Sequence, residues 1–125
     1  VCPAGGAFSY LDAWFALPHA ARLQSVQIHG RDNSSQHDQS LFLFRVCHGQ
    51  VGAPPAAAAT TLLGVASTSG INQGFMAGIN VPGTEIADAA HCRYLLRVRL
   101  TAEGAACLGD DMILDRALVA YQVLP

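Results

Sequence analysis

Short apolar runs separated by turn residues recur along the whole chain, and within these runs apolar and polar positions alternate. The alternation is clearest at 93–100, where Tyr94, Leu96 and Val98 share one face and three arginines share the other. A period of two residues is typical of β-strands that bury one face. We expect strands at 13–17, 22–29, 41–47, 62–67, 75–81, 93–100 and 113–124. The pattern predicts no amphipathic helix of three turns.

Two of these segments indicate which side chains form the core. In 22–29, Val26 and Ile28 are expected to point inward, whereas Leu23 belongs to the alternate set that points outward. The segment 41–47 is apolar at nearly every position, which predicts a central strand covered on both faces.

Turn-forming residues separate the predicted strands. Asp, Asn and Ser at 31–35 favour a turn, because they tolerate left-handed backbone angles and bond their own backbone. The stretch 49–61 holds two prolines and four consecutive alanines, which predicts a long surface loop. The chain is therefore expected to be an all-β protein, a two-sheet antiparallel β-sandwich with seven or eight strands. Its architecture is expected to be jelly-roll or immunoglobulin-like, in a single domain over 1–125.

The composition is poor in charge. Charged residues make up 13% of the 125 residues and hydrophobic residues 51%, against roughly 25% charged in typical soluble domains. Two explanations are open: drift toward alanine and arginine in a GC-rich genome, or a surface partly buried against other copies or a partner. The net charge of −2 gives no electrostatic footprint for nucleic acid. Because Gly, Pro, Ser and Asn break the longest charge-free stretch, 46–84, we expect no membrane span.

Four dispersed cysteines, Cys2, Cys47, Cys92 and Cys107, predict two structural disulfides. Four cysteines allow three pairings, and our working choice is Cys47 with Cys92 and Cys2 with Cys107. Cys47 ends one predicted strand and Cys92 begins another. Because disulfides persist outside reducing compartments, we expect an extracellular or periplasmic protein whose signal peptide has been removed.

Several runs along the chain resemble a broad group of uncharacterised secreted bacterial β-sandwich proteins. The runs are Val1-Cys2-Pro3, the residues Ala-Leu-Pro-His-Ala-Ala at 16–21, Arg-Asp-Asn-Ser-Ser at 31–35, Tyr-Leu-Leu-Arg-Val at 94–98 and Arg-Ala-Leu-Val-Ala-Tyr at 116–121. The resemblance implies a β-sandwich and carries over no activity or catalytic residues. Members of the group usually have sequence before the Cys-Pro, so a first edge strand is expected to be missing or supplied by a neighbour.

Candidate catalytic and metal-binding patterns are few. Asp110, Asp111 and Asp115 form one carboxylate cluster that predicts either a Ca²⁺ loop or a solvated acidic loop, the second being favoured. The chain has no G-x-S-x-G nucleophile motif. The histidines show no HxH or HExxH spacing and are interpreted as surface or loop residues; they are His19, His29, His37, His48 and His91. We expect no metal and no other cofactor.

Aromatic residues near the N-terminus are the candidate ligand contacts. Trp14 and Phe15 are adjacent, so in a strand one faces inward and the other outward. An exposed ring of Trp14 or Tyr10 on a sheet face can stack on a sugar; the alternative is that both rings serve packing. Asn33 begins an Asn-Ser-Ser sequon in a predicted turn, which makes it a glycosylation candidate.

The sequence is compatible with three classes of function. The first is an extracellular structural subunit that associates with other copies of itself, as an oligomer or filament, without catalytic activity. The alternative is a secreted carbohydrate-binding module, with glycans as partners. A small exported enzyme is the third class, and the sequence offers no constellation that supports it.

Overall fold

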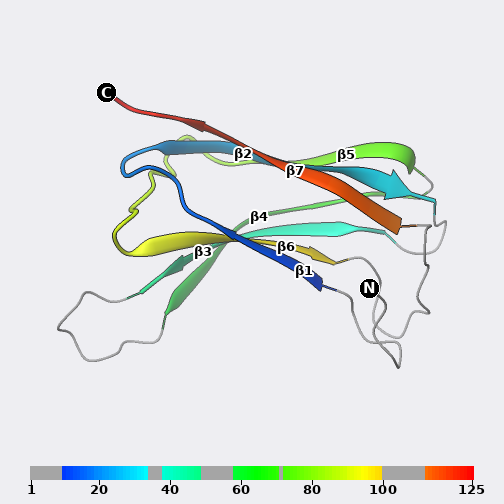
Figure 1. Ribbon diagram of the computed structural model, residues 1–125, viewed down its shortest axis with the longest axis horizontal. Helices are drawn as coiled ribbons and strands as arrows, with labels where there is room; N and C mark the ends of the chain where they lie inside the picture. Colours follow the sequence, from blue (N-terminus) through cyan, green and yellow to red (C-terminus); the bar gives the residue numbers. More distant parts are fainter. Residues whose placement is uncertain (1–9, 34–37, 49–57, 71, 100–111) are drawn as a thin grey trace.

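The computed structural model of the chain describes residues 10–33, 38–48, 58–70, 72–99 and 112–125. The described chain folds into two layered β-sheets (Figure 1). The strands are β1 (Tyr10–Phe15), β2 (Arg22–Asp32), β3 (Ser40–Cys47), β4 (Ala59–Ser67), β5 (Asn72–Asn80), β6 (Cys92–Arg99) and β7 (Met112–Gln122). No helix occurs in these residues, so none of them offers a helical span for a membrane.

All strand pairs are antiparallel. One sheet has the order β1-β6-β3-β4, and the other has the order β5-β2-β7. The predicted two-sheet, all-β architecture is confirmed, with seven strands in the described residues. The finer assignment to a jelly-roll or immunoglobulin-like topology stays a prediction. β3 and β4 are the one pair of these strands adjacent both in sequence and in a sheet.

The core lies between the sheets and consists of aliphatic side chains, several of them alanines, together with the ring of Tyr94. The buried side chains at its centre come from β2, β3 and β6. They are Leu23, Val26, Ile28, Leu41, Leu43, Tyr94, Leu96 and Val98. The ring of Phe15 stacks on that of Tyr94 at 5.3 Å between centroids and extends the core toward β1. The alternation at 93–100 therefore predicted the buried face of β6 correctly.

Leu23 corrects the prediction for the second strand. Val26 and Ile28 are buried as expected, but Leu23 is also completely buried. The register between β2 and β7 shifts between Leu23 and Ser25, so Gln24 forms a β-bulge that reverses the phase of the alternation. A bulge adds one residue to one strand, which places Leu23 on the same face as Val26.

β3 also differs in part from its prediction. It is central in its sheet, between β6 and β4, as its apolar sequence indicated. Leu41 and Leu43 point into the core, but Phe42 and Phe44 lie on the outer face and remain partly exposed. The described residues place no second layer over that face, so β3 is covered on one side by the other sheet and not on both.

Strand ends differ from their predicted positions in both directions, because backbone pairing rather than the apolar run sets them. β1 spans Tyr10–Phe15 instead of 13–17, and β7 ends at Gln122 instead of 124. β4 begins at Ala59, opposite Cys47, inside the stretch 49–61 that was predicted to be a loop. β2 continues to Asp32, which pairs with both of its neighbours, inside the predicted turn at 31–35.

Candidate functional site

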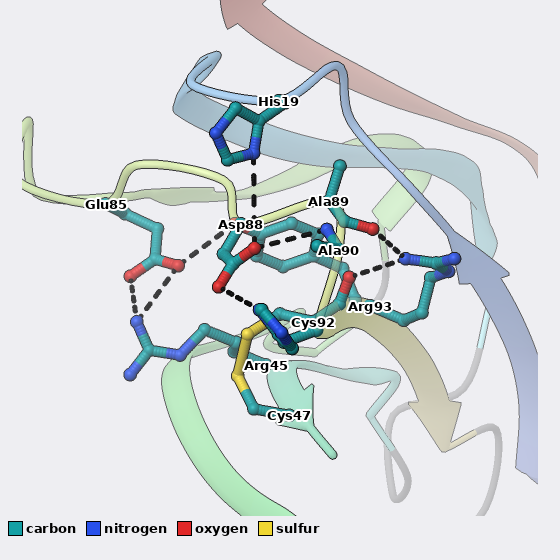
Figure 2. The surroundings of a disulfide bond; sticks show 11 residues. His19, Arg45, Cys47, Glu85, Asp88, Ala89, Ala90, Cys92 and Arg93 are labelled. Atoms are coloured by element: carbon teal, nitrogen blue, oxygen red, sulfur yellow. Dashed lines mark hydrogen bonds and ion pairs between the residues drawn. A yellow bond between two sulfur atoms is a disulfide. The ribbon is translucent and has the colours of Figure 1, made fainter. Parts of the chain in front are cut away.

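A disulfide closes one end of the four-stranded sheet, as predicted for Cys47 and Cys92. The two residues are directly opposite in the β3–β6 register, and their sulfur atoms are 2.06 Å apart. Figure 2 shows polar side chains gathered around this bond. Cys2 and Cys107, the other predicted pair, lie outside the described residues.

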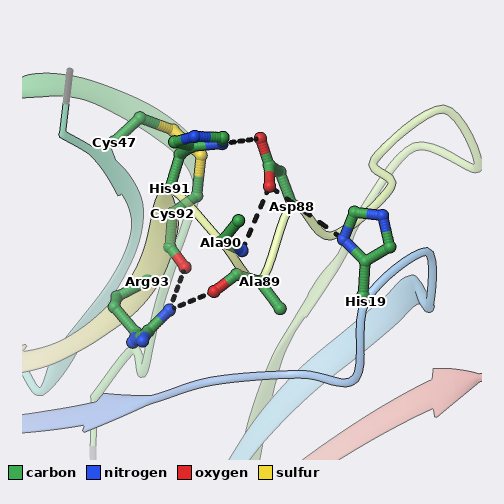
Figure 3. A network of polar contacts seen from close by, with 8 residues as sticks. All are labelled: His19, Cys47, Asp88, Ala89, Ala90, His91, Cys92 and Arg93. Atoms are coloured by element: carbon green, nitrogen blue, oxygen red, sulfur yellow. Dashed lines mark hydrogen bonds and ion pairs between the residues drawn. A yellow bond between two sulfur atoms is a disulfide. The ribbon is translucent and has the colours of Figure 1, made fainter. Parts of the chain in front are cut away.

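Asp88 is the centre of the polar contacts beside the disulfide (Figure 3). Its carboxylate accepts a hydrogen bond from the Ala90 backbone N–H at 3.1 Å and lies 2.8 Å from His91 Nδ1. His19 Nδ1 is 4.0 Å away on the other side. The hydrogen bond with His91 is the main reason why the pKa of Asp88 lies below its usual value. Since an ionised carboxylate only accepts, Nδ1 of His91 carries the proton in this contact.

This Asp–His pair holds a turn and lacks a nucleophile. Asp88 O also accepts the backbone N–H of Cys92 at 2.8 Å, which closes the turn that leads into β6. Among the described residues no hydroxyl or free thiol is hydrogen-bonded to His91, and Cys92 is oxidised. In the same part of the chain no group of three or more His, Cys, Asp or Glu side chains is arranged to hold a metal ion.

A second polar group lies deeper, where Glu85 is buried against β3 and β6. Glu85 accepts hydrogen bonds from Arg45 Nη1 at 2.9 and 3.2 Å and from the Tyr94 hydroxyl at 3.0 Å. Burial, with the carboxylate of Glu85 as a further cause, raises the pKa of Tyr94 well above its ordinary value. This network satisfies the Glu85 carboxylate and the Tyr94 hydroxyl and anchors the β5–β6 connection to the sheet.

The outer surface of the four-stranded sheet is the more unusual feature, and we call it the outer aromatic face. Its side chains include Tyr10, Asp12 and Trp14 of β1; Arg93, Leu95, Arg97 and Arg99 of β6; Phe42 and Phe44 of β3; and Leu62 and Val65 of β4. By the same register Ser40, Val46, Thr60 and Ser67 lie on this face too. Trp14 is 59% exposed, and Tyr10, Leu62 and Val65 are each about half exposed. The outer face of an antiparallel sheet is ordinarily polar.

Aromatic rings and guanidinium groups interleave on the outer aromatic face. Arg97 donates two hydrogen bonds to Asp12, of 2.7 Å from Nε and 2.6 Å from Nη2, and lies 5.1 Å from the Tyr10 ring centroid. Arg99 lies 5.9 Å from the centroid of Phe42. The hydrogen bond from Arg97 is the main cause that holds the pKa of Asp12 below its usual value. The ion pair fixes Arg97 beside the exposed rings.

The other sheet presents a different outer surface. Its outward positions on β2 carry Ser25, Gln27 and His29, and those of β5 include Gly78 and Asn80. The apolar side chains on this surface, chiefly Met76 and Leu118, are scattered among polar ones. The concentration of apolar and aromatic side chains is therefore specific to one of the two outer surfaces.

The third feature is the side of the sandwich at which the edge strands β1 and β7 lie, and we call it the open side. β4 and β5 contact each other, so β1 and β7 are the far edges of their two sheets. Leu11 and Ala13 of β1, and Ala117 and Tyr121 of β7, are opposite buried core residues in the pairing register and therefore face inward. All four are nevertheless exposed, Leu11 by 40% and Tyr121 by 45%.

The structure brings together some of the predicted site residues. Trp14 and Tyr10 share the outer aromatic face, and Phe15 faces inward, as the adjacency of Trp14 and Phe15 required. Asn33 directly follows β2 and is partly buried; its glycosylation stays a prediction.

The proposed acidic cluster is only partly described. Asp115 is an exposed residue of β7, whereas Asp110 and Asp111 lie outside the described residues. Sequence reasoning missed Asp12 and Arg97 as partners, because 85 residues separate them. The alternating arginines of β6 were the available signal for a charged outer face.

Comparison of the chain with protein-family models, with curated proteins and with solved structures gives no match.

Proposed function

We propose that this chain is an extracellular structural subunit, without catalytic activity, that associates with other copies of itself. The observation that carries the proposal is the open side, where inward-facing residues of β1 and β7 are exposed. A sandwich buries both inner faces when its edges are closed. Full burial of a side chain such as leucine is favourable by about 1.5–3 kcal/mol, and covering the exposed 40% of Leu11 and 45% of Tyr121 gains part of that energy. The disulfide supports an oxidising compartment.

A second copy of the chain suits the open side because β7 is not protected against pairing. Sheet edges commonly carry lysine, proline or several charges that prevent association. β7 has 11 residues, and Asp115 and Arg116, of opposite sign, are its only charged residues. Its pairing partner among the described strands is β2 alone, so one row of backbone groups faces away from the sheet. Two copies can therefore approach without net repulsion between these edges.

The geometry of the contact sets the form of the assembly. Pairing of β7 with β7 of a second copy is two-fold and closes into a dimer. Pairing of β7 with β1 of a second copy joins different surfaces; if the rotation does not close a ring, it builds a filament. Light scattering after size exclusion, with negative-stain images of the same fractions, distinguishes the two forms.

The test places a charge on the open side. Tyr121→Lys or Leu11→Lys is expected to raise the dissociation constant at least about tenfold, since each buries an ammonium group at the contact. Met76→Lys is the matched control, because Met76 is 62% exposed on the outer surface of β5, at the opposite edge. A wild-type monomer of 13.1 kDa at all concentrations would contradict the proposal, and so would equal effects of all three variants.

A carbohydrate-binding module is the second candidate function, and one observation favours it. Trp14 and Tyr10 lie four residues apart on one face of β1, about 13 Å along the strand, and both rings are exposed. An aromatic ring on a flat surface can cover the C–H face of a sugar. Reproducible binding of a polysaccharide that is lost in Trp14→Ala would support this function.

A further inference from the structure

We propose that the outer aromatic face binds a polysaccharide that carries uronic acid groups, with Trp14 stacking on a sugar ring and Arg97 contacting a carboxylate. This inference rests on the second candidate function, carbohydrate binding, and names its ligand class. It uses a surface separate from the open side, so it does not depend on self-association.

The charge on this face points to an acidic ligand. Among the described residues of this face, Arg93, Arg97 and Arg99 carry guanidinium groups and Asp12 carries a carboxylate, which is paired with Arg97. Arg93 donates to the backbone oxygens of Ala89 and Cys92, and Arg99 donates to Ser40 Oγ, so both keep their positive charge in hydrogen bonds to neutral groups. The whole chain has only seven basic residues and a net charge of −2. Nearly half of the basic residues therefore lie on one face of one strand, in a chain that is negative overall. A positive patch of this kind attracts anionic partners.

The position of Trp14 supports a ring contact. Its cross-strand neighbour on β6 is Leu95, which faces outward and yet is only 8% exposed. Leu95 is thus a covered apolar floor between its two cross-strand neighbours, Trp14 and Phe44. Trp14 itself is the most exposed aromatic side chain among those whose exposure the structure describes. A large exposed ring beside a filled apolar floor is suited to covering a flat ligand.

Arg97 is positioned to receive the acidic group of the same ligand. It lies opposite Asp12, two residues along β1 from Trp14, and diagonal neighbours of this kind are about 7–8 Å apart. Asp12 takes the Nε and Nη2 edge of the guanidinium, which has five N–H donors in all. The Nη1 amino group makes no hydrogen bond to the described residues and can donate to a carboxylate. The ion pair therefore orients Arg97 without using all of its donors.

The experiment uses the full chain. It compares acidic polysaccharides with an uncharged ester, and variants of the proposed site with control variants on the other sheet. Calorimetric titration compares polygalacturonate and alginate with fully methyl-esterified pectin, which keeps the galacturonate backbone but lacks its charge. We expect both polyuronates to bind, with an affinity that falls as salt rises, and the ester to bind at least about tenfold more weakly. Heparin serves as the sulfated comparison, and dextran as the neutral one.

Trp14→Ala and Arg97→Gln are expected to weaken polygalacturonate binding about tenfold or more. Met76→Ala and Arg116→Gln, at exposed positions of the other sheet, are expected to change it less than about twofold. Circular dichroism and the thermal midpoint check that each variant is folded. If Arg116→Gln weakens binding as much as Arg97→Gln, the assigned site is wrong.

The remaining outcomes distinguish binding of an acidic polysaccharide from carbohydrate binding in general. Equal binding of the polyuronates and the methyl ester, lost in Trp14→Ala, would keep carbohydrate binding and overturn the acidic class. Binding of heparin alone would overturn the carboxylate assignment. Absence of any polysaccharide binding by the folded chain would overturn both. A fall in native mass in Trp14→Ala would show instead that copies of the chain cover this face.

Discussion

The buried network around Glu85 gives the sharpest prediction for stability. Glu85 is 7% exposed and joins Arg45 of β3 to Tyr94 of β6 through three hydrogen bonds. We consider the substitution Glu85→Ala, which removes the shared acceptor and leaves both donors in place. Its backbone contacts, including the acceptance of the Leu23 N–H at 3.1 Å, are unaffected by the substitution.

The expected loss follows from the two donors taken separately. Removing one partner of a buried ion pair costs about 3–5 kcal/mol, but the Arg45 side chain is 34% exposed and can be rehydrated. We therefore reduce its share to about 1–2 kcal/mol. The buried Tyr94 hydroxyl loses its acceptor, at a cost of about 1–3 kcal/mol. The total is about 2–5 kcal/mol.

Urea denaturation with the disulfide intact measures this loss, and a double-mutant cycle assigns it. Tyr94→Phe alone is expected to cost about 1.5 kcal/mol, since the ring keeps its packing against Phe15. The double variant is expected to be more stable than the sum of the single losses predicts, by about 1 kcal/mol. A loss below about 1 kcal/mol for Glu85→Ala, or no coupling with Tyr94→Phe, would refute the assignment of stability to this network.

Three further outcomes are expected. Replacing Cys47 and Cys92 by serine removes a cross-link between residues 45 positions apart in the sequence. In the chain-entropy model this should lower the free energy of unfolding by about 4 kcal/mol, as measured by urea denaturation. An unchanged denaturation midpoint would contradict this prediction. Gly64→Ala places a methyl group against a core isoleucine of β5 and should lower the thermal midpoint, whereas Gly74→Ala meets open space and should not. The lowered pKa of Asp12 adds stability that is present above the ordinary aspartate pKa of 3.8 and is lost as the pH falls through the lower pKa of the folded state. Asp12→Asn should remove up to about 1 kcal/mol at neutral pH and flatten the acid limb of a pH titration of stability.

The fold was predictable from the sequence where a strand keeps a strict alternation. Tyr94, Leu96 and Val98 are buried because no extra residue interrupts β6, so the period of two carries through the strand. Leu23 was predicted wrongly because a β-bulge at the neighbouring residue reverses the phase, and composition does not mark where a partner strand imposes a bulge.

The candidate site was predictable only in its separate parts. The adjacency of Trp14 and Phe15 predicted that one ring faces outward, but not which one, and the surroundings of Trp14 depend on which strand pairs with β1. Arg97 joins Asp12 across 85 residues because β1 pairs with β6, and no local pattern encodes that pairing. The Cys47–Cys92 disulfide could be predicted because one cysteine ends an apolar strand sequence and the other begins one, and these two strands are the central pair of one sheet.

The disulfide between directly opposed residues also bears on how the chain folds. Most pairs of neighbouring strands are distant in sequence, and such topologies fold slowly because large loops must close before contacts form. Oxidation of Cys47 and Cys92 closes one of these loops in advance and ties the end of β3 to the start of β6. The bond thereby sets the register of the central strand pair, and a slip by one residue would turn every buried side chain outward. Refolding of the oxidised chain therefore starts with the loop between β3 and β6 already closed.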